Sequence, residues 1–241
     1  MLYRADFHIH SCLSPCASLE MSPISIVRKA KNERLDAIAL SDHNCTFNLP
    51  AFGKICERHG LDCLYGMEVT TAEEAHMLCL FDDLDPAMEL GARVYDSLPD
   101  VPNRPGRFGD QPIIDENEEI LGFAEKFLIS ASGYDIASLL DLVHSLGGLF
   151  VPAHIDRQVF GIISQLGFLP DEAFDAVELT VHGDPALALD YPIVRNSDSH
   201  ELHTLGNTFT EFDIDALTVA SIRSSLWKDR VGNQPGERRG R

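Results

Sequence analysis

The sequence predicts an α/β fold built from repeated strand–helix units. Short apolar runs alternate with amphipathic segments along most of the chain, a pattern typical of βα units. Side chains that can bind metals follow these runs, at the ends of the expected strands. Because α/β barrels gather functional side chains at the carboxyl ends of their strands, the two observations together favour a barrel. The chain has 241 residues, which is enough for one such domain.

The first half of the chain contains four expected strands and one clearly marked helix. Ser22 is a good helix N-cap and Pro23 suits the first helical turn, so we expect a helix from there to about Arg34. The apolar runs that predict strands cover residues 3–9, 36–40, 61–65 and 76–81.

The second half continues the alternation. Asp135 can cap a helix whose apolar residues recur at helical spacing, and Gly147-Gly148 ends it. Asp215 can cap a last helix that runs to about Trp227. Strands are expected at residues 149–151, 176–180 and 193–195.

The domain organisation follows from two stretches that interrupt this rhythm. Residues 97–130 are rich in Pro and Gly and contain an acidic run, so we interpret them as an inserted loop or lid. Residues 229–241 are rich in Gly, Arg and Pro and are expected to form a flexible tail. We therefore expect a single domain over residues 1–228.

Composition excludes several classes of protein. The formal net charge is −19, and such an acidic surface repels phosphates, so long nucleic acid is an unfavourable partner. No apolar run approaches the roughly 20 residues of a membrane helix, and the first residues lack a signal-peptide pattern. We expect a cytoplasmic protein whose six cysteines are thiols. No CxxC pair supports a closed structural zinc site.

Histidines and carboxylates mark successive strand ends. His8 and His10 are two residues apart on a strand, so both imidazoles point the same way and can reach one ion. The other members follow later strands or, for His76, open one: His43, Glu68, His76, His154, Asp198 and His200. Imidazoles with carboxylates suit zinc, manganese or iron. The set predicts a hydrolase that holds divalent metal ions.

The remaining histidines are weaker candidates. His59 lies near an expected helix end and His144 lies on an expected helix, so both are interpreted as ordinary surface or core residues. His182 and His203 each follow a strand or motif closely, and the sequence leaves their role open.

The ordered motifs resemble the PHP (polymerase and histidinol phosphatase) superfamily. The resemblance rests on His8-Ile9-His10-Ser11, Ser41-Asp42-His43, Gly66-Met67-Glu68, His76, His154 and Asp198-Ser199-His200, and it spans residues 6 to about 206. It implies a distorted (β/α)7 TIM-like barrel and a metal-dependent phosphoesterase. The implied substrate is a small phosphorylated metabolite or nucleotide, attacked by a metal-bridging hydroxide. The oligomeric state is not implied.

The resemblance also implies roles for the site residues. Glu68, Asp198 and His200 would be catalytic. One ion would be held by His8, His10, Glu68 and Asp198, and Glu68 would bridge to a second ion held with His76 and His154. A third ion would be held by His43 and His200.

The chain departs from the family pattern at one point. After the first motif the family supplies an Asp or His ligand for the third ion, where this chain has Pro15 and Cys16. Cys16 is either a thiolate ligand, which would favour zinc, or a packing residue, so two or three ions are expected. Arg157 is the candidate for binding the substrate phosphate, ahead of Arg104, Arg107 and Lys126 in the inserted segment.

Two other functions are compatible with the same residues. An amidohydrolase-type enzyme would use the metals to hydrolyse a C–N bond, and it would be favoured by a carboxylatable lysine at a strand end. No lysine of the chain lies cleanly at one, and Glu68 takes the bridging role instead. A non-catalytic, metal-binding PHP module is the other alternative.

Overall fold

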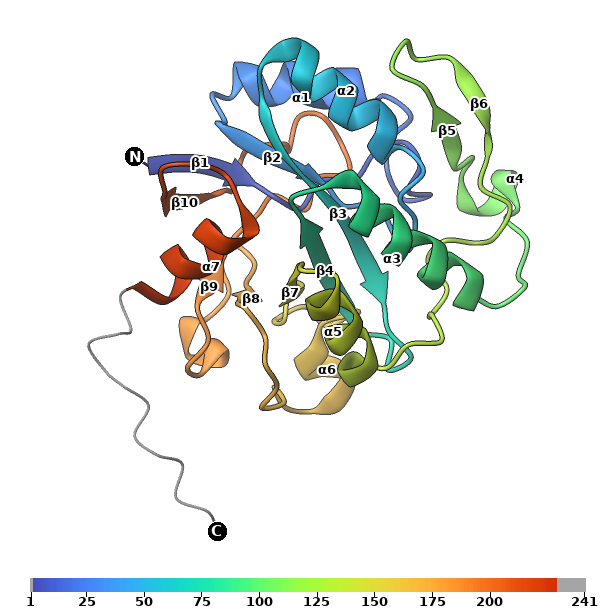
Figure 1. Ribbon diagram of the computed structural model, residues 1–241. Helices are drawn as coiled ribbons and strands as arrows, with labels where there is room; N and C mark the ends of the chain where they lie inside the picture. Colours follow the sequence, from blue (N-terminus) through green and yellow to red (C-terminus); the bar gives the residue numbers. More distant parts are fainter. Residues whose placement is uncertain (1, 229–241) are drawn as a thin grey trace.

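A computed structural model describes residues 2–228 as a mixed α/β domain around one curled sheet (Figure 1). The tail expected at residues 229–241 lies outside the described residues. Six strands form the sheet in the order β10-β1-β2-β3-β4-β7. Their bounds are Thr210–Asp213 for β10, Leu2–Asp6 for β1, Ala37–Leu40 for β2, Asp62–Thr70 for β3, His76–Phe81 for β4 and Leu149–Pro152 for β7.

Strand direction departs from a simple run of parallel βα units. Strands β1, β2 and β3 are parallel, but β4 runs antiparallel to both β3 and β7. The start of β4 therefore lies at the edge of the sheet where β1, β2, β3 and β7 end. This reversal places His76, the first residue of β4, beside residues that follow the parallel strands.

Helices cover the outer face of the sheet (Figure 1). They are α1 (Pro23–Asn32), α2 (Leu49–His59), α3 (Leu84–Ser97) and α5 (Ile136–Ser145). Alternate strand residues such as Met77, Cys79 and Phe150 share the core with these helices, as the two-residue period of a strand requires. The predicted helices at Pro23 and Asp135 are confirmed, with Ser22 and Asp135 as side-chain caps.

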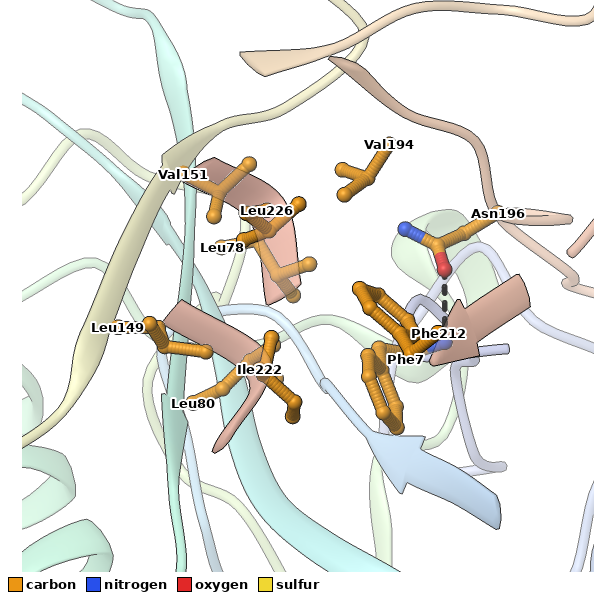
Figure 2. A pocket seen from close by; sticks show the side chains of 10 residues that line it. All are labelled: Phe7, Leu78, Leu80, Leu149, Val151, Val194, Asn196, Phe212, Ile222 and Leu226. Atoms are coloured by element: carbon orange, nitrogen blue, oxygen red, sulfur yellow. Dashed lines mark hydrogen bonds between the residues drawn. The ribbon is translucent and has the colours of Figure 1, made fainter. Parts of the chain in front are cut away.

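The inner face is filled at one end by α7 (Val219–Trp227). Ile222 and Leu226 pack towards Leu78 and Leu80 around a small apolar cavity, and Phe7 stacks on Phe212 with ring centroids 5.6 Å apart (Figure 2). The residues that carry chemistry thus occupy the other end of this face.

The cap expected for α7 was wrong. Thr218, and not Asp215, begins this helix, because its hydroxyl accepts the Ser221 N–H in a capping box. The sequence indicated only the end of α2, near His59, and did not identify α3.

The strands that would complete a barrel are short. β8 (Val177–Glu178) and β9 (Ile193–Val194) form a separate two-stranded parallel sheet. Single backbone hydrogen bonds link this part to its neighbours, such as Ile155 N–H to the Glu178 carbonyl at 2.9 Å. Among residues 2–228 the strand pairs therefore form a half-barrel and not the closed seven-stranded ring that we expected.

The inserted segment, residues 97–130, has secondary structure of its own. It contains α4 (Pro105–Phe108) and the hairpin of β5 (Pro112–Ile114) and β6 (Ile120–Phe123), which stands apart from the central sheet (Figure 1). Gly109 lies against the loop after β1, since a Cβ there would be 2.4 Å from the Pro15 carbonyl oxygen. Ser22 also donates a hydrogen bond to Glu118. The segment therefore contacts the loop that carries Cys16.

Short helices complete the described fold. They are α6 (Ile162–Leu166) and a 3-10 helix, η1 (Pro185–Ala188). No helix within residues 2–228 is both long and apolar enough to cross a membrane.

Candidate metal centre

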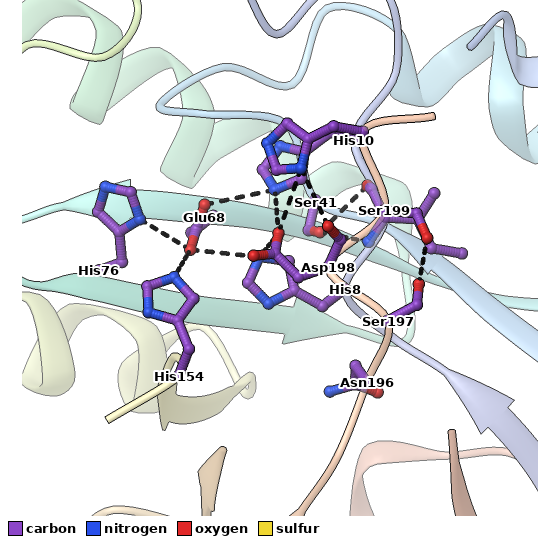
Figure 3. A network of polar contacts seen from close by, with 12 residues as sticks. His8, His10, Ser41, Glu68, His76, His154, Asn196, Ser197, Asp198 and Ser199 are labelled. Carbon is purple, nitrogen blue, oxygen red and sulfur yellow. Dashed lines mark hydrogen bonds and ion pairs between the residues drawn. The ribbon is translucent and has the colours of Figure 1, made fainter. Parts of the chain in front are cut away.

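The structure brings the histidines and carboxylates predicted from the motifs into one cluster. They approach one another at the carboxyl end of the parallel strands, on the inner face of the sheet (Figure 3). Backbone hydrogen bonds fix the loops that carry them, including His10 N–H to the Ser199 carbonyl at 3.0 Å and Asn44 N–H to the Glu68 carbonyl at 2.9 Å. Six members are buried and two, Asp198 and His200, are half-buried: His8, His10, His43, Glu68, His76, His154, Asp198 and His200.

Glu68 lies at the centre of the cluster. Its Oε1 is 2.9 Å from His76 Nδ1, 3.0 Å from His154 Nε2 and 3.2 Å from His8 Nε2. Its Oε2 is 3.1 Å from His43 Nδ1 and 3.4 Å from His10 Nε2. One carboxylate thus contacts five imidazoles, which is the geometry expected of a bridging ligand.

Asp198 forms the second acidic element. Its Oδ1 is 3.1 Å from His10 Nε2 and 3.3 Å from His8 Nε2. Its Oδ2 is 2.5 Å from Nη1 of Arg157, whose side chain is 44% exposed. Arg157 therefore connects the buried cluster to the solvent side of the site.

Three groups of side chains within residues 2–228 have ligand atoms close enough to hold an ion. They are His8, His10 and Asp198; His43, Glu68 and His76; and His10, His43 and His200, with ligand atoms within 4.8 Å of one another. The first group contains three of the four residues expected for the first ion and lacks Glu68. In the other two groups, His43 lies near Glu68 as well as near His200. The structure therefore does not divide the ligands between the second and third ions in the way that we expected.

The unsatisfied polar atoms of the cluster fit a set of metal ligands. Four imidazole nitrogens are buried without a hydrogen-bond partner: His8 Nε2, His43 Nδ1, His76 Nε2 and His154 Nδ1. Buried polar atoms are rarely left in this state, because each costs the desolvation free energy of the group. Imidazole nitrogens together with carboxylate oxygens are suitable donors for divalent transition metals.

The electrostatics keep both carboxylates ionised. Burial of Glu68 favours the neutral acid, but the nearby imidazoles, foremost His76 and His8, outweigh burial and lower its pKa well below the usual range. Burial likewise opposes ionisation of Asp198, and the charge of His8 with the hydrogen bond to His10 lowers that pKa as well. The centre is therefore negatively charged at its middle and lined with imidazoles, as a cation site requires.

Cys16 lies beside the third group. The residue is exposed, but its thiol hydrogen-bonds with His200 and His43. Partial burial raises the pKa of this thiol, and the two hydrogen bonds outweigh that effect and lower the pKa to about 7. Where the family pattern has an Asp or His ligand, this chain thus has a thiol that ionises readily.

Two members of the cluster have unusual backbone conformations. The φ angles of His154 and Asp198 are 28° and 47°, in the left-handed region that non-glycine residues rarely adopt. Such conformations cost roughly 1–3 kcal/mol and concentrate at functional sites. Both residues are held there by the surrounding structure.

Sequence reasoning missed the polar residues that support the cluster. Glu178 on β8 is buried with both carboxylate oxygens near His8 Nδ1, at 2.9 and 3.1 Å. Ser14 Oγ is 3.0 Å from His10 Nδ1 and donates to Asp42. A signal was available for Glu178, since a carboxylate within the apolar run 176–180 is costly unless it has partners.

Other candidate residues lie outside the cluster. His144 pairs with Asp175 at 2.9 Å, while His59 is half-buried and His182 and His203 are exposed. Lys126 Nζ donates to three backbone carbonyls at the end of α3, so it is engaged in local structure. Arg104 and Arg107 are exposed on the inserted segment.

Comparisons with known proteins agree with this arrangement. A PHP domain model matches residues 6–201, and a PHP-associated model matches residues 185–231. No curated protein sequence matches the chain.

Several solved structures share the fold. The lesion-specific endonuclease Q from Pyrococcus furiosus has a TM-score of 0.70 at 20% identity, over 94% of this chain and 56% of its own. This chain thus spans a little over half of that protein's length. A protein from Bifidobacterium adolescentis described as a metal-dependent phosphoesterase has a TM-score of 0.62 at 18% identity, over 92% of this chain and 95% of its own. An amidohydrolase from Chromobacterium violaceum has a TM-score of 0.55 at 15% identity, over 95% and 96% of the two chains.

These identities establish similarity of fold, while the family model covers most of the chain and includes every residue of the cluster. The chain belongs to the PHP domain family.

Proposed function

We propose that this protein is a metal-dependent phosphoesterase that hydrolyses a small phosphorylated metabolite or nucleotide. The observation that carries the proposal is the carboxylate of Glu68 in contact with five imidazoles, of which His76 and His154 also have their other nitrogen buried without a hydrogen-bond partner. Two or three zinc, manganese or iron ions would supply an activated water and neutralise charge on the phosphoryl group.

The residues of the cluster would divide the work. Glu68 would bridge neighbouring ions, and Asp198 with His8 and His10 would hold the first of them. His76 and His154 would complete the second site. His43 and His200, with Cys16, would form the third, and His200 lies towards solvent, where it can approach a substrate.

Arg157 is the group that we propose for binding the substrate phosphate. Its guanidinium already pairs with the buried carboxylate of Asp198, and its side chain is partly exposed. A planar guanidinium can bind two phosphate oxygens at once, so an arriving phosphate would compete with Asp198 for it. The inserted segment, residues 97–130, contacts the Cys16 loop and is proposed as the lid of this site.

Substrate size separates two versions of the proposal. The net charge of −19 disfavours a long polyanion, which supports a small substrate. A similar fold occurs in endonuclease Q, which has been crystallised with a duplex that carries an abasic lesion at its active site. Damaged DNA is therefore the second substrate class to test.

We propose the cytoplasm as the location of this protein. Its six cysteines are free thiols, in keeping with a reducing compartment.

Hydrolysis of a C–N bond is the alternative reaction. The amidohydrolase with a related fold keeps it in consideration. Within residues 2–228, however, no lysine is buried, and the buried carboxylate of Glu68 takes the central position of the cluster. The other alternative is a module that binds metal without catalysis.

The test is phosphate release from a panel of small phosphomonoesters and phosphodiesters, with protein loaded with manganese or zinc. A DNA duplex with an abasic site and a set of cyclic amides complete the panel. We expect turnover of a small phosphoester that a chelator abolishes and that the Asp198→Asn variant lacks. Turnover of the DNA alone or of an amide alone would reject the small-phosphoester proposal, and an inert protein that binds metal tightly would support the non-catalytic module.

A further inference from the structure

We infer that Glu178 is a positioning residue that keeps the proton of His8 on Nδ1 and so presents Nε2 to the metal centre. The inference rests on the proposed function only where it concerns turnover. The effect of Glu178 on metal affinity does not depend on that function.

Glu178 collects three contacts from three different parts of the fold. Its Oε2 is 2.9 Å from His8 Nδ1 and accepts the backbone N–H of His154 at 2.9 Å. Its Oε1 accepts the side-chain amide of Asn196 at 2.8 Å. The carboxylate is buried, so no solvent competes for these positions.

Counting the protons fixes the tautomer of His8. A backbone N–H can only donate, so His154 supplies a proton to Oε2. The amide oxygen of Asn196 accepts the backbone N–H of Phe7 at 2.8 Å, which leaves its NH₂ group to donate to Oε1. Both oxygens of Glu178 therefore act as acceptors, and the contact with His8 is a hydrogen bond that Nδ1–H donates.

When His8 is neutral, with its proton on Nδ1, the lone pair of Nε2 is directed into the cluster. His8 Nε2 is 3.2 Å from Glu68 Oε1 and 3.3 Å from Asp198 Oδ1, and it is buried without a hydrogen-bond partner. Lone pairs of His8 Nε2, Glu68 Oε1 and Asp198 Oδ1 thus point to the place where a cation would be held. An outer carboxylate that fixes a ligating imidazole in this manner also increases its basicity.

Glu178 also sets the spacing of the site. It joins His8 after β1, which would hold the first proposed ion, to His154 after β7, which would hold the second. Their ring centroids are 5.8 Å apart. Because β8 and β9 contain only two residues each, side-chain bonds of this kind replace the missing strand ladder.

The chain offers a matched control in Asp175, three residues before Glu178. Its buried carboxylate also pairs with an imidazole, His144 Nε2 at 2.9 Å, and accepts a backbone N–H of β7, from Phe150 at 2.8 Å. It lies at the opposite end of β7 from His154, and among residues 2–228 it belongs to no group of side chains that could hold an ion. Loss of Asp175 should therefore affect stability and leave metal affinity unchanged.

The first experiment compares the zinc affinity of the full-length wild type, Glu178→Gln and Asp175→Asn by competition with a chromophoric chelator. A glutamine has one acceptor oxygen and would direct its NH₂ towards a donor, so we expect zinc affinity to fall roughly 10- to 100-fold. Asp175→Asn should keep the affinity of the wild type although its unfolding temperature is lower. A folded Glu178→Gln variant with the affinity of the wild type would overturn the inference.

A second experiment needs no variant. Long-range proton–nitrogen NMR of zinc-loaded wild-type protein should show His8 with a protonated Nδ1 and a zinc-bound Nε2. Zinc bound through Nδ1 would overturn the inference. Failure of every phosphoester assay would reject the proposed function and leave both results standing.

Discussion

His76 Nδ1 lies 2.9 Å from Oε1 of Glu68, across the antiparallel strands β4 and β3. Glu68 is paired with Leu78, two residues after His76, so both side chains project from the inner face. The contact exists because β4 reverses direction and begins at the edge where β3 carries Glu68.

Replacement of Glu68 by Gln should disable the centre. The variant removes the charge that five imidazoles share, so metal affinity should fall by more than the roughly 10- to 100-fold typical of outer partners. Metal content after gel filtration and phosphate release measure the effect. Glu74→Gln changes an exposed carboxylate in the turn before β4 and should behave as the wild type. Equal metal content in Glu68→Gln and wild type would contradict the assignment.

Removal of metal should lower both activity and stability. A ligand that binds only the folded state, present at 100 times its dissociation constant, contributes about 2.7 kcal/mol. For a chain of this size that corresponds to roughly 5–11 °C in the unfolding temperature. Scanning calorimetry with and without chelator measures the shift, and added zinc or manganese should restore it. The Glu68→Gln variant should show little response, and an unchanged wild-type unfolding temperature would argue against the centre.

Substitution of Arg157 should affect substrate binding. Charge-assisted hydrogen bonds contribute about 1.5–3 kcal/mol, so Arg157→Ala should lower kcat/KM roughly 10- to 100-fold, mainly through KM. Arg157→Lys keeps the charge without the planar fork and should recover only part of the loss. Arg93→Ala, which removes a surface pair with Glu89, is the control. If KM of Arg157→Ala equals that of the wild type, Arg157 does not bind the phosphate.

Cys16 should be a ligand of the third site. Cobalt-substituted wild-type protein should show a thiolate-to-metal charge-transfer band that Cys16→Ser lacks. Cys63→Ser replaces a partly buried thiol on β3, outside the cluster, and should retain the band. A band that persists in Cys16→Ser would make Cys16 a packing residue, and metal analysis would then distinguish two ions from three.

The contribution of Asp175 to stability should depend on pH. Burial raises the pKa of this carboxyl, but hydrogen bonds with His144 and Arg223 outweigh it and lower the pKa below its usual range. A lowered folded-state pKa stabilises the protein above the unfolded-state value, about 3.9, and the contribution is lost as the pH falls through the folded-state pKa.

Asp175→Asn should therefore lower the free energy of unfolding by about 1–3 kcal/mol at neutral pH, and the difference should shrink below about pH 4. Urea unfolding across this pH range measures it. Asp141→Asn, at an exposed position of α5, should show no difference at any pH. A gap for Asp175→Asn that stays constant down to the lowest pH would contradict the ionic origin.

The sequence by itself identified the histidines and carboxylates that gather in the cluster. A two-residue period on a strand directs His8 and His10 the same way, and polar residues that follow buried strands are expected at one edge of a sheet. These relationships are local, so the residues of the cluster and the helices capped by Ser22 and Asp135 could be identified from the chain alone. The positions of Glu68, His154 and Asp198 in the order of motifs also sufficed to indicate the family.

Only the tertiary structure decided how these residues are grouped and supported. The reversal of β4, the open half-barrel and the meeting of Glu178 with His8, 170 residues apart, depend on hydrogen bonds between distant segments. The sequence pattern of a strand gives the period of its side chains but neither its direction nor its neighbour. Its partners across the sheet set both, because the backbone groups of each strand are satisfied by another part of the chain.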